Sequence, residues 1–154
     1  MKLRTFGCAV LLALVFITPD FAQQSAPARQ PDVVFVPTPN DVVNAMLRLA
    51  NVSTSDVVYD LGSGDGRIVI TAAKMYGAHG VGIDIDPERT REATANAAKN
   101  GVADKVTFRT EDLFLADISP ATVVTLYLSG PVNARLAPKL MKELKPGTRI
   151  VSHA

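Results

Sequence analysis

The chain has 154 residues, of which 47% are hydrophobic, enough for one domain with a packed core. Its formal net charge of +1 gives no support for the strong phosphate attraction typical of nucleic-acid-binding proteins. The single cysteine, Cys8, lies in an N-terminal apolar segment, so the chain forms no internal disulfide and its remainder has no thiol nucleophile or thiolate metal ligand. We therefore expect one domain with no metal site.

The N-terminus has the order of a secretory signal. Lys2 and Arg4 precede an apolar run over residues 6–17, and polar residues follow up to Ala22, after which cleavage is expected. The run has 12 residues, fewer than the about 20 that cross a bilayer. We expect residues 1–22 to direct the protein to the periplasm or out of the cell. An uncleaved membrane anchor is the alternative, and without it no membrane span is expected.

A polar linker precedes the expected domain. Residues 23–35 begin with a proline-bearing stretch that has no periodicity, so we expect a linker there and the domain over residues 36–154. The domain opens on an extended Val36-Pro37-Thr38-Pro39 segment, because proline disfavours helical angles in the residue before it. Thr38 or Asn40 can cap the helix that follows.

Strands and helices then alternate, which predicts an α/β domain with a doubly wound, Rossmann-like and mostly parallel sheet. Continuous apolar strands, such as residues 123–128, suit a sheet covered on both faces. We expect helices from about residue 40 to 49 and at 67–76, 87–99 and 132–144, and strands at 56–61, 80–85, 105–109, 121–128 and 149–153.

The most distinctive segment is Asp60-Leu61-Gly62-Ser63-Gly64-Asp65-Gly66-Arg67, which follows the first expected strand. Its glycines recur at every second position, unlike the Gly-x-Gly-x-x-Gly spacing of dinucleotide sites. Such a strand, turn and helix start lets bare backbone approach a small polar ligand. Asp60 and Asp65 would repel a pyrophosphate and favour a cation.

Further acids follow the next two strands, at the edge where a doubly wound sheet binds its ligands. Asp84 or Asp86 ends the second strand, about 20 residues past the glycines, and can accept hydrogen bonds from ribose hydroxyls. Either can instead cap the next helix, and we favour Asp84 for the ribose. Asp112 follows the third strand and can accept from an adenine amino group.

These motifs resemble those of the class I S-adenosylmethionine-dependent methyltransferases over about residues 36–153. Residues 57–66 look like the glycine-rich first motif, residues 80–87 like the second, and Glu111-Asp112-Leu113 like the adenine motif. Within that superfamily the chain resembles the mitochondrial lysine methyltransferases of ATP synthase c-subunit and adenine nucleotide translocase, and their bacterial relatives. The matching segments include Val36-Pro37 and Leu144-Lys145-Pro146-Gly147-Thr148-Arg149-Ile150-Val151-Ser152.

The resemblance implies the strand order 3-2-1-4-5, S-adenosylmethionine as cofactor and a protein lysine as acceptor. It implies that the glycine turn faces the methionine part of the cofactor and that Asp60 lies near its ammonium. Asp84 would hold the ribose, and Ile85 and Leu113 would flank the adenine. The implied cofactor-binding residues are Asp60, Gly62, Ser63, Gly64, Gly66, Asp84, Ile85, Asp112 and Leu113.

The acceptor half of the site has a weaker signal. The fourth strand ends in Tyr127-Leu128-Ser129-Gly130-Pro131, where nucleic-acid amino methylases carry Asn or Asp followed by Pro-Pro-Tyr. The absence of that motif argues against a DNA adenine methylase. Tyr127 and Ser129 are candidates for lining the acceptor site, and no residue is assigned to catalysis.

Two features favour a different interpretation. The sequence stops just after the fifth strand, where the family sheet continues with an antiparallel hairpin, and an open sheet edge invites self-association. A signal peptide would also send the protein where the methyl donor is not abundant. The alternative to an active enzyme is therefore a degenerate S-adenosylmethionine-binding domain or a truncated methyltransferase. A dinucleotide-dependent oxidoreductase would need the other glycine spacing.

Overall fold

The structure is a computed structural model that describes residue 30 and residues 34–153. The expected signal peptide at residues 1–22 lies outside this range. Among the described residues, no helix is both long and apolar enough to cross a bilayer. The elements follow one another as α1 (Asn40–Leu49), β1 (Val57–Leu61), α2 (Arg67–Tyr76), β2 (His79–Asp84), α3 (Pro87–Lys99), β3 (Val106–Thr110), β4 (Val123–Leu126), α4 (Gly130–Glu143) and β5 (Arg149–Ser152).

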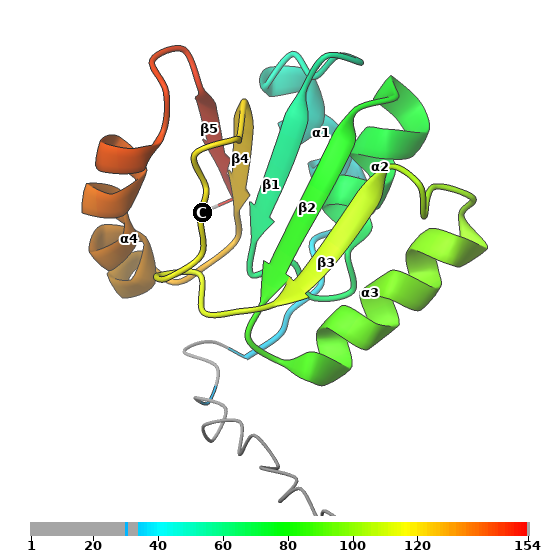
Figure 1. The fold of residues 1–154 in the computed structure, drawn as a ribbon, viewed down its shortest axis with the longest axis horizontal. Helices are drawn as coiled ribbons and strands as arrows, with labels where there is room; N and C mark the ends of the chain where they lie inside the picture. The colour runs from blue at the N-terminus through cyan, green and yellow to red at the C-terminus, as the bar shows by residue number, and fades with distance from the viewer. Residues whose placement is uncertain (1–29, 31–33, 154) are drawn as a thin grey trace, which may run out of the picture.

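The strands form one parallel sheet in the order β3-β2-β1-β4-β5, which confirms the prediction (Figure 1). Strand β1 lies at the centre, and the register places Asp60 between Gly82 of β2 and Thr125 of β4. Because all strands are parallel, their carboxyl ends share one edge of the sheet. Strands β3 and β5 are the two edge strands, and self-association at β5 stays a prediction.

Two apolar clusters cover the two faces of the sheet. Helices α1, α2 and α3 pack on one face, against residues such as Val58 and Val123. Helix α4 and the segment after β3 pack on the other face, against Tyr59 and Leu61. Successive side chains of a strand point to opposite faces, so Asp60 shares the face of α1 and α2.

Several element ends differ from those expected. Helix α1 begins at Asn40 after Pro39 and has no side-chain cap, so the expected capping by Thr38 or Asn40 is wrong. Helix α3, in contrast, has a side-chain cap: Asp86 accepts from the backbone N–H of Glu88 at 2.8 Å. Strand β4 ends at Leu126 and not at residue 128, because the chain turns there toward α4.

One buried acid joins three strands at their amino ends. Asp56 is 4% exposed and accepts hydrogen bonds from Thr122 Oγ1 at 2.7 Å and from the Ser53 backbone at 2.8 Å. Arg149 of β5 forms an ion pair with the same carboxylate. Burial acts to raise the pKa of Asp56, but the hydrogen bonds and Arg149 outweigh it and hold this pKa below its usual value.

We expect Asp56→Asn to lower the free energy of unfolding by about 2–3 kcal/mol at pH 7, because it leaves Arg149 and Thr122 without their buried charged partner. The folded pKa is depressed, so the wild-type advantage is present above the unfolded pKa and is lost as pH falls through the folded one. Urea denaturation measures both effects. Glu143→Gln, which removes the i,i+4 partner of Lys139, is the control, and an equal loss in both variants would contradict the prediction.

Candidate active site

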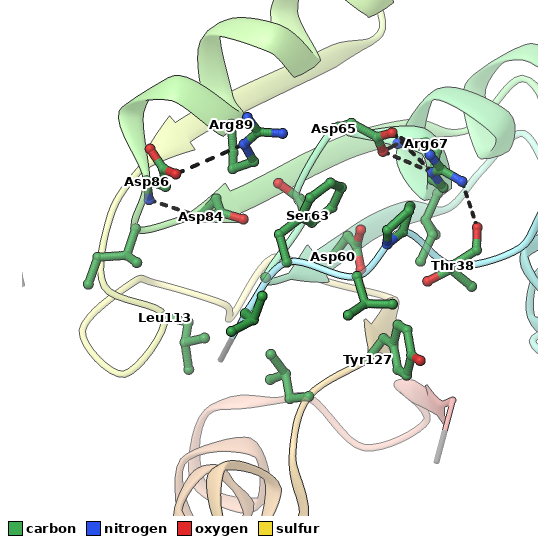
Figure 2. A pocket seen from close by; sticks show the side chains of 18 of the residues that line it. Thr38, Asp60, Ser63, Asp65, Arg67, Asp84, Asp86, Arg89, Leu113 and Tyr127 are labelled. Carbon is green, nitrogen blue, oxygen red and sulfur yellow. Dashed lines mark hydrogen bonds and ion pairs between the residues drawn. The ribbon is translucent and has the colours of Figure 1, made fainter. Parts of the chain in front are cut away.

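A cavity of about 400 Å³ opens at the carboxyl ends of β1, β2 and β4 (Figure 2). Its volume falls within the range of small-molecule sites. Asp60, Ser63, Asp84, Leu113 and Tyr127 surround the same space in Figure 2, although they come from different elements. The lining residues are Val34, Phe35, Val36, Pro37, Thr38, Asp60, Gly62, Ser63, Asp65, Arg67, Ile68, Asp84, Ile85, Asp86, Arg89, Asp112, Leu113, Tyr127, Leu128 and Val132.

Asp60 forms the most buried polar part of the lining. Its side chain accepts a hydrogen bond from Thr125 Oγ1 at 2.8 Å, and the residue is 3% exposed. Burial raises the pKa of Asp60 to about 7, and the nearby charges of Asp84 and Asp65 act in the same direction while Thr125 opposes them. A carboxylate in this position gains a favourable interaction from any cation that enters the cavity.

The backbone N–H groups of the glycine turn form hydrogen bonds with other groups of the protein. The N–H groups of Gly62 and Ser63 both donate to the Ile83 carbonyl, at 2.8 and 2.9 Å, and Gly66 N–H donates to the Ser63 carbonyl. These donors are therefore not free to hold a phosphate, which argues against a dinucleotide site. Ser63 Oγ is buried and has no hydrogen-bond partner within residues 34–153, so it offers a polar group to a ligand.

Two of the predicted glycines do not line the cavity. Gly64 N–H donates to Asp84 Oδ2 at 2.8 Å, and a Cβ on Gly64 would lie 2.1 Å from the Phe35 ring. A Cβ on Gly66 would lie 2.5 Å from the Phe108 ring. Both residues adopt positive φ angles, +51° and +80°. In this structure they shape the turn and admit neighbouring aromatic rings, and their direct contact with the cofactor stays a prediction.

The two acids after β2 have separate tasks. Asp84 Oδ2 accepts from Gly64 N–H and Oδ1 from Asp86 N–H at 3.0 Å, which fixes the carboxylate against the glycine turn. Each oxygen keeps a further lone pair for a ligand hydroxyl. Asp86 also lines the cavity, but it caps α3. This arrangement supports the preference for Asp84 at the ribose.

The residues predicted for the adenine come together at the same rim. Ile85 follows β2, and Asp112 and Leu113 follow β3, and all three line the cavity. Asp112 Oδ1 accepts from Phe114 N–H at 2.9 Å, which holds the turn after β3. Two apolar side chains and a carboxylate thus line one part of the cavity, and their contact with the adenine stays a prediction.

Of the two candidates for the acceptor site, only Tyr127 lines the cavity. Tyr127 lines the cavity, and its ring lies on that of His153 with a centroid distance of 4.2 Å. Nδ1 of His153 is buried without a hydrogen-bond partner in the described part of the chain. Ser129 does not line the cavity; it is exposed at the N-terminal cap position of α4. Leu128 and Val132 complete the apolar side near Tyr127.

Sequence reasoning missed the segment formed by residues 34–38, which we call the strap. All five of its residues line the cavity, although the linker was expected to extend to residue 35. Figure 1 shows the chain before α1 passing the carboxyl ends of β1, β2 and β3. The only available signal was the Val36-Pro37 match to the family. Arg89 was also missed, because a charged residue in a helix has no distinguishing pattern.

Asp65 and Arg67 shape the site more than they offer free charges. Arg67 Nη2 forms an ion pair with Asp65 at 2.5 Å, and Arg67 Nη1 donates to the Thr38 carbonyl at 2.8 Å. This pair holds the end of the glycine turn against the segment that precedes α1. Five aspartates and two arginines line the cavity, so its formal charge is negative and it favours a cationic ligand. The described residues contain no cluster of three potential metal ligands.

We expect the wild-type protein to lose stability as pH rises, and Asp60→Asn to lose less. The folded pKa of Asp60 lies above the unfolded value of 3.8, so the folded state holds a proton that the unfolded state releases. Wild-type stability should therefore fall by about 2–3 kcal/mol between pH 5 and pH 8 from this group alone. The fall should be smaller in the variant, which retains an oxygen to accept from Thr125.

Urea denaturation at several pH values measures this difference. Asp41→Asn, in the exposed first turn of α1, is the matched control and should keep the wild-type pH dependence. Parallel curves for wild type and Asp60→Asn would show that burial does not perturb Asp60.

Comparisons with known proteins agree with this geometry. A family model described as the ANTKMT methyltransferase domain matches residues 60–154. A protein-lysine N-methyltransferase from Saccharolobus islandicus is 56% identical over 124 residues, which cover 80% of this chain and 77% of that protein.

Solved structures show the same fold with the cofactor product bound. An RNA methyltransferase from Salinibacter ruber, in complex with S-adenosyl-L-homocysteine, has 62% identity and a TM-score of 0.76, and the match covers 76% of each chain. A methyltransferase from Geobacter sulfurreducens in the same kind of complex has 28% identity and a TM-score of 0.67. That match covers 74% of this chain and 47% of the other.

The cavity itself fits S-adenosylmethionine. Its negative lining suits a sulfonium and an ammonium, the unpartnered Ser63 hydroxyl is available for a polar group, and Asp84 has acceptor capacity for a ribose. The family model covers more than half of the chain, and the Saccharolobus relative is similar over most of its length. The chain therefore belongs to the ANTKMT methyltransferase domain family and is an S-adenosylmethionine-dependent methyltransferase.

Proposed function

We propose that this protein methylates the side-chain amine of a lysine in another protein. The observation that carries the proposal is its 56% identity to a protein named a protein-lysine N-methyltransferase, over most of both chains. The site adds support, because the cavity has an apolar and aromatic side at the end of β4. Tyr127, Leu128 and Val132 form that side.

The described residues supply binding and orientation more than proton transfer. S-Adenosylmethionine, when bound, supplies an activated methyl group whose leaving group is a neutral thioether. The chain must then bring the acceptor into line with that methyl group, and such positioning can supply much of the rate acceleration. Asp84 is rigidly held by two backbone N–H groups, so it is suited to fix the ribose. Asp60 is suited to attract the ammonium of the cofactor.

The acceptor side suits a lysine for a physical reason. An ammonium must lose its proton before it can attack, and an apolar environment favours the neutral amine by penalising the charged one. Leu128 and Val132 are buried apolar residues beside Tyr127. The methylene stem of a lysine can pack along such a surface while its nitrogen reaches the cavity.

RNA is the second candidate acceptor, because the Salinibacter relative is named an RNA methyltransferase. The charge balance of this chain opposes it: basic and acidic residues number 16 and 15, and the cavity lining is negative. An RNA acceptor would bring additional phosphates to that lining. The experiment must therefore distinguish protein from RNA.

We expect the purified protein and tritiated S-adenosylmethionine to label protein in an extract of the source cells. The label should be released as methyllysine after acid hydrolysis and should disappear on protease treatment. Asp84→Ala is the control and should abolish labelling, because its carboxylate both holds the glycine turn and lines the cavity where the cofactor is expected. Label that is sensitive to ribonuclease and resistant to protease would overturn the lysine proposal in favour of RNA.

We expect Tyr127→Ala to lower kcat/KM for the protein acceptor by about tenfold or more, since it removes the ring at the acceptor side. Binding of S-adenosylhomocysteine, measured by calorimetry, should change less than about threefold. Tyr127→Phe should retain most of the activity if the ring, not the hydroxyl, is used. Ser129→Ala changes an exposed residue outside the cavity and should behave as wild type; a larger loss there than at Tyr127 would reverse the assignment.

A further inference from the structure

We propose that Phe35 is a cofactor-binding residue carried on the strap, and that Arg89 positions its ring. The proposal concerns retention of the cofactor and does not depend on which acceptor the enzyme uses. It rests on contacts at both ends of the strap and on the exposure of its apolar side chains. These contacts join the strap to the glycine turn and to α3.

The carboxyl end of the strap is fixed to the glycine turn. Arg67 Nη1 donates to the Thr38 carbonyl at 2.8 Å, and Asp65 holds the same guanidinium through its carboxylate (Figure 2). Thr38 itself is only 5% exposed. The strap therefore leaves α1 in a defined direction, along the cavity opening.

The Phe35 ring lies against the backbone of Gly64. A Cβ at position 64 would come within 2.1 Å of Phe35 Cε2 and 2.6 Å of Cδ2, so only glycine admits the ring in this place. The Gly64 N–H is bonded to Asp84, and the ring thus covers a turn whose polar group is already satisfied. This contact brings an aromatic side chain from outside the sheet to the residue next to Ser63 in the cofactor loop.

Arg89 of α3 also contacts the Phe35 ring. Its guanidinium carbon lies 5.1 Å from the Phe35 ring centroid, within the range of a cation–π interaction. Glu92 binds Arg89 Nη1 at 2.5 Å, and Asp86 lies 3.9 Å from its Nε. Arg89 belongs to α3, which begins three residues after Asp84, the acid expected at the ribose. Phe35 thus contacts both the glycine turn and α3, the two segments expected near the methionine part and the ribose of the cofactor.

The strap exposes apolar surface that a bound ligand would cover. Phe35 is 40% exposed, Val34 88% and Val36 57%, although all three line the cavity. Removing such surface from water favours the bound state. Because these exposed apolar side chains line the cavity, loss of their contacts with a bound ligand should act mainly on dissociation of the cofactor. We therefore assign Phe35 to retention of the cofactor and not to the transfer step.

The test measures binding of S-adenosylhomocysteine and needs no acceptor. Phe35→Ala should raise Kd about tenfold, chiefly through faster dissociation in stopped flow, while the melting temperature of the free protein stays close to wild type. Phe35→Trp keeps an aromatic ring and introduces the only tryptophan of the chain. Its affinity should stay near wild type, and its fluorescence should change when S-adenosylhomocysteine is added. An unchanged Kd in Phe35→Ala, or an unresponsive tryptophan that still binds the ligand, would overturn the assignment.

The role of Arg89 is tested by a double-mutant comparison. Arg89→Ala should raise Kd about threefold, and the double variant Phe35→Ala/Arg89→Ala should bind no more weakly than Phe35→Ala alone. Additive losses would show that Arg89 acts independently of Phe35 and would overturn its positioning role. The matched control is Arg135→Ala, which removes another cation–π pair, with Phe114 at 3.8 Å, whose two members do not line the cavity. Normal binding with no transfer to any lysine would contradict only the proposed function.

Discussion

The site depends on one almost fully buried acid, Asp60, at the end of the central strand. Asp60 is held by Thr125 of the adjacent strand, and the parallel register that makes them neighbours is the register of the whole sheet. Burial holds the pKa of this carboxyl near neutrality, so the free protein keeps a polar group in an unfavourable state. A cationic cofactor reverses that penalty, because it stabilises the ionised carboxylate. The buried Asp60 carboxyl thus lowers the stability of the free protein and increases its affinity for a cationic cofactor.

The glycine turn and the acids around it form one connected structure. Asp84 accepts from Gly64 and from the backbone that leads into α3, so the turn after β1 and the turn after β2 keep a fixed relation. Other backbone N–H groups of the turn donate to carbonyls of the protein itself, mainly that of Ile83. A phosphate-binding loop, in contrast, directs such groups at its ligand. Recognition is therefore left to carboxylates and to the Ser63 hydroxyl, which suits a sulfonium and a ribose and does not suit a pyrophosphate.

The sequence predicts the sheet and the acids well, because both are encoded by local patterns. The alternation of strands and helices predicts the α/β fold, and the family resemblance implies the observed strand order. Asp60, Asp84 and Asp112 line the cavity as expected. The glycines were harder, since the pattern reveals a tight turn but not what lies against it. Gly64 faces Phe35, which is 29 positions away, and no local rule predicts that contact. Ser129 was misleading for a similar reason: β4 ends two residues earlier than its apolar run, which leaves Ser129 exposed.

The strap shows how the same constraints reach beyond the sheet. Arg67 is bound by Asp65 and uses a remaining donor to fix Thr38, while Asp84 fixes the glycine against which Phe35 rests. The acids that favour a cation thus also determine where the covering segment lies. Replacing Asp65 or Asp84 would disturb both the glycine turn and the strap. Small changes around this turn should consequently alter cofactor affinity more than overall fold, because the apolar clusters on both faces of the sheet lie below it.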